Sequence, residues 1–115
     1  MIEITLPWPP TVNTYWRSFN NRVLISAKGR EYRTAVADQV LIQGMAKHID
    51  HAVKVEIKAY RPDRRRRDLD NILKALLDAL THAGVMDDDA LIEDLRVYWA
   101  DEVGGMVKVT IEEMK

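Results

Sequence analysis

The fold of this chain is decided by residues 53–83, which read VKVEIKAYRPDRRRRDLDNILKALLDALTHA. Over residues 53–60, apolar side chains alternate with charged ones, which predicts a strand with one buried face. Over residues 69–83, apolar side chains return every three or four positions, which predicts a helix. Gly84 follows at the place where a glycine usually ends a helix. The stretch therefore predicts a strand, a loop and an amphipathic helix in direct succession.

Opposite charges are concentrated in the loop between this strand and this helix. Five arginines lie within residues 61–67, and an Asp-x-Asp pair, Asp68 and Asp70, follows at once. Arginine presents a planar fork that suits phosphate, and paired carboxylates suit a divalent metal. Cations for a polyanion beside ligands for a metal are typical of a metal-dependent nuclease.

The flanking segments predict a small sheet covered by two helices. Alternating apolar residues predict strands at 2–6, 95–99 and 107–111, with a shorter one at 23–25. Ser26 suits the N-cap of a helix that would run to about Lys47. We therefore expect an α+β fold, a mixed sheet of about four strands packed with two main helices, in a single domain over residues 1–115.

Composition removes several classes of function. The content is 47% hydrophobic and 30% charged, as in ordinary globular proteins, and there is no cysteine for a disulfide or a thiolate metal site. Neither a signal peptide nor a membrane-spanning run is present, so we expect a cytoplasmic protein with no membrane partner. No glycine-rich phosphate loop supports a nucleotide cofactor. The net charge of −1 hides a basic block at 61–67 and an acidic block at 87–94.

The carboxylates and Lys74 each have a structural alternative to a catalytic role. Asp68 or Asp70 could serve only as a helix N-cap, and Asp70 with Lys74 could form an ordinary surface pair one helical turn apart. The run Asp87–Asp89 could be a solvated acidic turn. It reaches the Asp-x-Asp pair only if the chain returns along the length of the predicted helix.

Further cations and aromatic residues lie near the N-terminus. Trp8, Tyr15, Trp16 and Phe19 interleave with Arg17 and Arg22. Aromatic residues beside arginines can stack on bases or wedge into a duplex, and their alternative role is packing, which we favour for Trp8.

These residues together resemble the RusA family of Holliday-junction resolvases, which are small endodeoxyribonucleases. The opening ITLPWPPTVNTYWR is similar to the N-terminus of that family. The central signature is similar in PDRRRRDLDN, followed by LKALLDALTHAG and then DDDA. The resemblance covers nearly the whole chain in order.

The resemblance implies specific roles. Asp68, Asp70 and Asp89 match the metal ligands of the family, Lys74 matches its active-site lysine, and Arg67 matches a basic residue beside the site. Because Asp87 lengthens the acidic run, Asp88 and Asp89 both remain candidates to face the metal. The family implies a homodimer that uses Mg²⁺, with Mn²⁺ as a substitute, on four-way DNA junctions.

We therefore expect hydrolysis of DNA phosphodiesters by paired symmetrical nicks in a branched DNA, in recombination and repair. The catalytic residues would be Asp68, Asp70, Lys74 and Asp89. The expected DNA contacts are a group of arginines: Arg17, Arg64, Arg65, Arg66 and Arg67. Two alternatives stay open, namely a branched-DNA or RNA-binding module without catalysis, and a nuclease of broader branched-DNA specificity.

Overall fold

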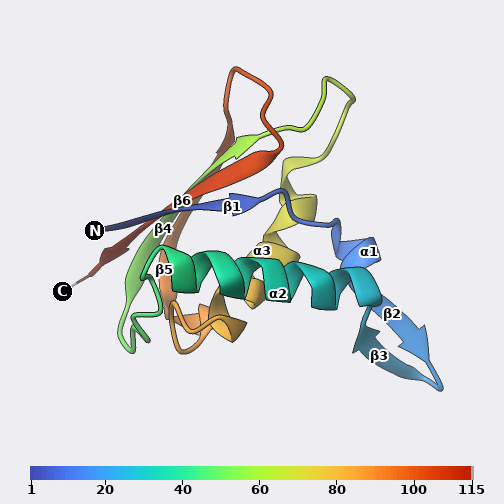
Figure 1. The fold of residues 1–115 in the computed structure, drawn as a ribbon, viewed down its shortest axis with the longest axis horizontal. Helices are drawn as coiled ribbons and strands as arrows, with labels where there is room; N and C mark the ends of the chain where they lie inside the picture. The colour runs from blue at the N-terminus through green and yellow to red at the C-terminus, as the bar shows by residue number, and fades with distance from the viewer. Residues whose placement is uncertain (115) are drawn as a thin grey trace.

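The computed structural model describes residues 1–114 and has the α+β architecture expected from the sequence (Figure 1). Its elements in chain order are β1 (Ile2–Pro7), α1 (Val12–Tyr15), β2 (Trp16–Phe19), β3 (Arg22–Ile25), α2 (Ala27–Ile42), β4 (Val53–Tyr60), the 3₁₀ helix η1 (Leu69–Ile72), α3 (Leu73–His82), the 3₁₀ helix η2 (Asp89–Leu91), β5 (Ile92–Trp99) and β6 (Met106–Glu113). No helix in the described part of the chain is long and apolar enough to cross a bilayer.

The main sheet has four strands in the order β1-β6-β4-β5. Strand β4 is central, antiparallel to β6 and parallel to β5. Two parallel neighbours need a crossover connection, and here η1, α3 and η2 supply it. The crossover runs out along the helix and back to the sheet, so the acidic run after α3 returns to the neighbourhood of the helix.

One face of the sheet carries the hydrophobic core. Val53, Val55 and Ile57 of β4 are fully buried, as the alternation predicts, and they pack with the buried faces of α2 and α3. Figure 1 shows both helices lying along this side of the sheet. Burial of Leu76 and Leu80 on the apolar stripe of α3 fixes the rotation of that helix, and its polar positions consequently face outward.

The N-terminus of α2 is as predicted and its C-terminus is not. The Ser26 hydroxyl accepts a hydrogen bond from the Gly29 backbone N–H at 3.0 Å, so Ser26 is the N-cap. The helix ends at Ile42 instead of about Lys47. Gly44 takes a positive φ of 68°, a conformation that terminates helices, and the apolar stripe has already run out because Ile42 is 74% exposed.

The predicted helix over 69–83 is built from two helical types. Residues 69–72 form η1 and α3 begins only at Leu73, so the first turn is tighter than an α-helix. Gly84 has a φ of 83°, which confirms its place after the helix.

A two-stranded hairpin, β2 paired with β3, stands apart from the main sheet. Residues 23–25 were expected to form a strand, whereas β2 was not, because Trp16–Phe19 lacks a clear alternation. The turn is made by Asn20 and Asn21 with φ values of 49° and 61°, the left-handed pair that a two-residue hairpin loop requires.

Candidate active site

The Asp-x-Asp pair lies where the arginine loop meets the helix. Asp68 holds the N-cap position of η1 and Asp70 lies inside η1, and both are exposed. The Asp68 side chain makes no capping hydrogen bond. Both oxygens of its carboxylate therefore remain available to other partners, which argues against the capping interpretation for this residue.

Lys74 lies on the next turn, as the second residue of α3, and is also exposed. No ion pair joins Asp70 to Lys74 among the interactions of residues 1–114, so the ordinary surface pair is absent from the described structure. The 3₁₀ geometry of η1 changes the angle between these positions from the one that an unbroken α-helix would give.

In the acidic run after α3, Asp88 caps a helix and Asp89 does not. Asp88 is the N-cap of η2, and its Oδ1 accepts a hydrogen bond from the Ala90 N–H at 2.9 Å. Asp89 is the first residue of η2 and is exposed. The turn η2 packs against α3, and β5, which follows it directly, packs against η1. The fold thus returns Asp89 toward the segment that carries Asp68 and Asp70.

The three carboxylates do not converge on one point within this chain. Over residues 1–114, no group of three or more histidine or acidic side chains is arranged to hold a metal ion. Asp68, Asp70 and Asp89 are each exposed, and they form no closed cage in the described structure.

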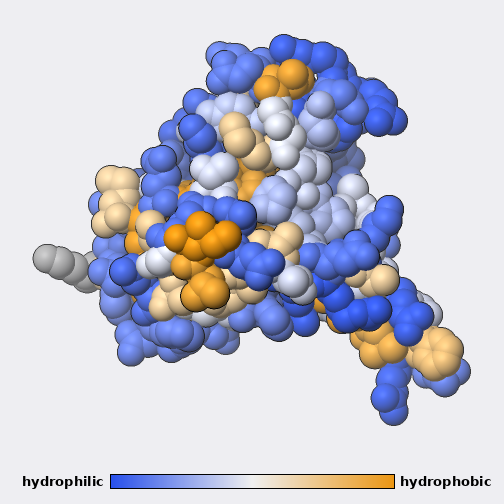
Figure 2. Space-filling view, viewed as in Figure 1, coloured by the Kyte–Doolittle hydropathy of each residue, from blue (hydrophilic) through white to orange (hydrophobic). Residues whose placement is uncertain are grey.

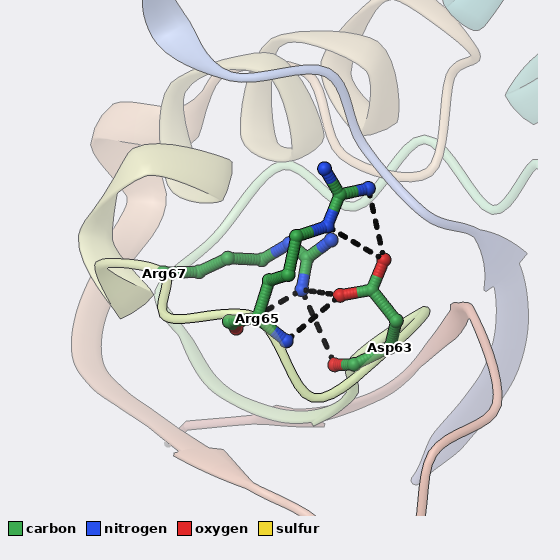
Figure 3. A network of polar contacts seen from close by, with 3 residues as sticks. All are labelled: Asp63, Arg65 and Arg67. Carbon is green, nitrogen blue, oxygen red and sulfur yellow. Dashed lines mark hydrogen bonds and ion pairs between the residues drawn. The ribbon is translucent and has the colours of Figure 1, made fainter.

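Asp63 organises the arginine loop, a role that no sequence pattern predicted (Figure 3). Its carboxylate accepts hydrogen bonds from the guanidinium groups of Arg67, at 2.7 Å, and Arg65, at 3.1 Å. The hydrogen bond from Arg67, followed by those from Arg65, holds the pKa of Asp63 well below its ordinary value. The loop is thus folded around an internal anion, which relieves the repulsion among consecutive arginines.

Arg64 and Arg66 make no contact with Asp63 and point elsewhere. Arg64 Nη1 donates to the backbone oxygen of Asp101 at 3.2 Å, which ties the loop to the β5–β6 connection. Arg66 is exposed and lines a cleft. That cleft has a volume of about 520 Å³, and its walls are Trp8, Thr11, Arg66, Arg67, Asp68, Asn71 and Ile72. A cation, an anion and an aromatic ring therefore face the same space.

Trp8 has the packing role that we favoured for it, and it also lines the cleft. It packs against the core and stacks on Trp99, with 6.0 Å between ring centroids and an interplanar angle of 13°. The guanidinium of Arg61 lies 4.2 Å from the centroid of the Trp99 ring. Packing thus holds Trp8 at one wall of the cleft that Asp68 and Arg66 also line.

A second polar network, also missed from the sequence, lies between α3 and the helices α1 and α2. Tyr15 and Arg33 both donate to Oδ2 of Asp78, Arg33 through its Nη2 at 2.7 Å. Arg33 Nε also lies 3.0 Å from the Tyr15 hydroxyl oxygen. These contacts join α1, α2 and α3 around one half-buried carboxylate, one turn after Lys74.

The pKa values of this network follow from its geometry. Burial by itself raises the pKa of Asp78, but the hydrogen bonds from Tyr15 and Arg33 and the charges of Arg33 and Lys74 outweigh burial, and the pKa is lowered. Burial, with the hydrogen bond to Asp78, raises the pKa of Tyr15 to about 12. The tyrosine hydroxyl therefore stays a donor and Asp78 stays an acceptor.

A sequence signal for Asp78 existed. It interrupts the predicted helix as the sole charged residue between Lys74 and His82, in a run of leucine and alanine. A carboxylate at the border of an apolar stripe needs a partner. The partners lie 63 and 45 positions earlier in the chain, beyond the reach of any local pattern.

We expect Asp78→Asn to destabilise the fold by about 1–3 kcal/mol at pH 7, because it leaves Arg33 half-buried without its anion. Since the folded-state pKa of Asp78 is lowered, its stabilising contribution is present above the unfolded pKa of about 3.9. That contribution is lost as the pH falls through the lower folded pKa. Urea unfolding of both proteins at pH 7 and near pH 3 measures it.

Asp38→Asn is the matched control, since Asp38 is an exposed carboxylate on α2 and its removal should shift stability by less than about 0.5 kcal/mol. A difference between wild type and Asp78→Asn that stays constant, or grows, as the pH falls to 3 would show that the carboxylate charge is not the stabilising element.

Comparison with known proteins places the chain in a family. The sequence model described as Endodeoxyribonuclease RusA matches residues 7–112. The chain is 49% identical to the crossover junction endodeoxyribonuclease of Enterobacteria phage 82 and 46% identical to that of Escherichia coli strain K12. Each alignment covers 97% of this chain and 94% of the relative. The corresponding protein of Enterobacteria phage HK97 is 40% identical, over 98% of this chain and 95% of its own length. By the family match and by this identity over nearly its full length, the chain belongs to the endodeoxyribonuclease RusA family.

Proposed function

We propose that this protein is a Mg²⁺-dependent endodeoxyribonuclease that resolves four-way DNA junctions by paired nicks and acts as a homodimer. The printed names of its relatives describe crossover junction endodeoxyribonucleases. The surface described above has the chemistry that such a reaction needs.

One observation carries the proposal. Asp68 is exposed and free of any capping bond, and it lines the same cleft as Arg66 and Arg67. A carboxylate with unused oxygens beside two guanidinium groups can hold a divalent ion at the phosphate that the arginines attract. A protein that only bound DNA would gain nothing from an anion at this place, because it repels the phosphate backbone.

The donors present fit Mg²⁺. This ion usually keeps several waters and takes one or two carboxylates together with substrate phosphate. Asp68 and Asp70 are two such carboxylates, both exposed and two residues apart at the head of η1. Asp89 on η2 is the third candidate carboxylate, because the capping bond of Asp88 leaves Asp89 as the freer of the two adjacent side chains. When bound, Mg²⁺ supplies Lewis-acid polarisation of the scissile phosphate and a water of lowered pKa.

The residues of the chain divide the remaining work. Arg66 and Arg67 bind the phosphates that flank the scissile bond, and Asp63 keeps Arg67 in a fixed orientation through its 2.7 Å ion pair. Lys74 places a positive charge where negative charge builds up on the phosphate in the transition state. The Asp78 network fixes α3, and with it Lys74, relative to α1 and α2.

Paired nicks require two equivalent sites. A four-way junction has two-fold symmetry, and a C2 homodimer presents one active surface to each of two opposite strands. One feature of the protomer supports self-association, namely that β5 lies at an edge of the sheet and could pair with a second copy.

The deciding experiment is cleavage of a synthetic four-way junction and of a matched linear duplex, each with Mg²⁺ and with EDTA. We expect nicks at symmetric positions in opposite strands of the junction, no cut in the duplex, and no cut with EDTA. Mn²⁺ should restore cleavage after EDTA treatment, because it also prefers oxygen ligands.

The other outcomes each point to a different activity. Tight junction binding without cleavage in either metal would identify a binding module and overturn the nuclease assignment. Cutting of flaps, forks and junctions at comparable rates would identify a nuclease of broader branched-DNA specificity.

A further inference from the structure

The β2–β3 hairpin exposes hydrophobic side chains that neither the core nor the candidate site uses. It extends away from the body of the molecule (Figure 1), and hydrophobic side chains show at its projecting end (Figure 2). Phe19 is 55% exposed and Val23 is 70% exposed. Such side chains on an isolated two-stranded sheet gain nothing from the core, so the hairpin is not shaped by folding alone.

The charges around the hairpin specify an anionic partner. Residues 12–30 contain four basic side chains and no acidic one, although acidic residues outnumber basic ones in the chain as a whole. The pairs Arg17↔Leu24 and Phe19↔Arg22 occupy one face of the hairpin, because alternate pairs share a side. Arg17 lies over the Phe19 ring at 5.5 Å from its centroid. An aromatic ring flanked by two guanidinium groups is suited to a nucleobase that lies between two phosphates.

The base of the hairpin is rigid. Ser26 N–H donates to the Tyr15 carbonyl at 2.8 Å, and the Ser26 hydroxyl donates to the Thr14 carbonyl at 2.5 Å. A Cβ on Gly29 would come within 2.7 Å of that same Tyr15 oxygen, so helix and hairpin are in direct contact. Only the tip, beyond this clamp, is free of the body.

The same clamp is connected to the proposed catalytic helix. Tyr15 is fully buried, and its hydroxyl donates to Asp78, one turn after Lys74 on α3. The hairpin therefore keeps a fixed position relative to the surface that carries Asp68, Asp70 and Lys74. A probe of DNA shape that is held at a constant offset from the cutting site is what structure-selective incision requires.

Resting on the function proposed above, we propose that the β2–β3 hairpin inserts its tip, with Phe19 on one face and Val23 on the other, into the branch point of the DNA. Arg17 and Arg22 bind the phosphates on either side. Insertion into an intact duplex must break a base stack, whereas at a branch point the stack is already interrupted. The hairpin consequently favours branched over linear DNA, and the arginine loop, which contacts phosphates alone, does not distinguish them.

The test uses the double variant Phe19→Thr/Val23→Thr in the full chain. Threonine is β-branched and suits a strand at both positions, but it removes the apolar surface. The matched control is Leu41→Gln/Ile42→Gln, which removes two exposed apolar side chains from the opposite end of α2. Binding to a four-way junction and to linear duplex is measured in EDTA, with 2-aminopurine placed at the branch point or ten base pairs away.

We expect wild type and the control to raise the fluorescence of 2-aminopurine at the branch point and not at the distant position. The hairpin variant should lose this rise. It should bind the junction about tenfold more weakly, in line with the loss of one stacked base, and bind the duplex within about twofold of wild type. Its mass by light scattering should equal that of wild type.

Three results would overturn the inference. Equal weakening on junction and duplex would make the hairpin a general phosphate-binding arm. An unchanged fluorescence rise in the hairpin variant would exclude insertion of Phe19. A lower mass for the variant alone would make the hairpin a contact between copies of the chain.

The fluorescence test of the hairpin and the cleavage test of the nuclease can fail separately. A wild-type protein that cuts junctions in Mg²⁺ but gives no branch-point fluorescence in EDTA would overturn the hairpin inference and leave the nuclease in place. A wild-type protein that gives the fluorescence but never cuts would overturn the nuclease and leave the hairpin inference intact.

Discussion

Replacing Asp70 with asparagine should reduce junction cleavage by at least about 100-fold while junction binding persists. Asparagine keeps the size of the side chain but removes the charge that a divalent ion needs, and loss of metal-based charge stabilisation costs several kcal/mol in the transition state. Binding should stay equal or become a few-fold tighter, because one negative charge near the DNA phosphates is gone. Single-turnover cleavage and gel-shift titration of the same junction measure the two quantities.

The expected separation between cutting and binding needs two comparisons. Asp38→Asn, on the exposed side of α2, removes a carboxylate of the same kind away from the cleft and should cut at the wild-type rate. Asp68→Asn should behave like Asp70→Asn, since both side chains are exposed at η1. If Asp70→Asn cut as fast as wild type, Asp70 would not be a metal ligand.

Lys74→Met should lower the single-turnover rate by about 10–100-fold, a smaller loss than the aspartate substitutions give. Methionine has a similar length without the charge, so it removes stabilisation of the developing negative charge on the phosphate. We place the loss below that of a buried oxyanion donor because Lys74 is exposed, and water screens its charge. Junction affinity should change by less than about threefold, because a single cation contributes little to a contact with many phosphates.

Two control variants, Lys74→Arg and Lys47→Met, test whether the loss of rate comes from the charge at position 74. Arginine retains the charge and should recover part of the rate, whereas Lys47→Met alters an exposed lysine in the loop after α2 and should leave the rate unchanged. A fall in affinity as large as the fall in rate would reassign Lys74 from the transition state to simple phosphate binding.

Local patterns were sufficient for most of the secondary structure. The alternation at Val53, Val55 and Ile57 identified the central strand, and the hydroxyl of Ser26 identified a helix start, because each depends on residues a few positions apart. The same reasoning placed the end of α2 near Lys47, five residues too late. It missed β2, whose four residues gain their strand conformation from pairing with β3 and not from their own alternation.

In the candidate site, too, local patterns predicted some residues and missed others. The arginine run, the Asp-x-Asp pair and Lys74 are adjacent in sequence, so their proximity was predictable, and the family match agrees with the resemblance seen in these residues. Two acidic residues escaped notice. Asp63 lies inside the arginine run and pairs with Arg67, and Asp78 lies within a leucine-rich helix.

The sequence by itself determined the chemical groups that this protein brings to its substrate, the elements that carry them and the family to which it belongs. The tertiary structure decided which groups meet. Asp78 finds Tyr15 and Arg33 across 63 and 45 positions of chain, and Trp8 meets Asp68 across one cleft. The physical reason is that short-range patterns report burial and capping along one element. The parallel crossover from β4 through α3 to β5, with the packing of α2 on α3, sets the distances between elements.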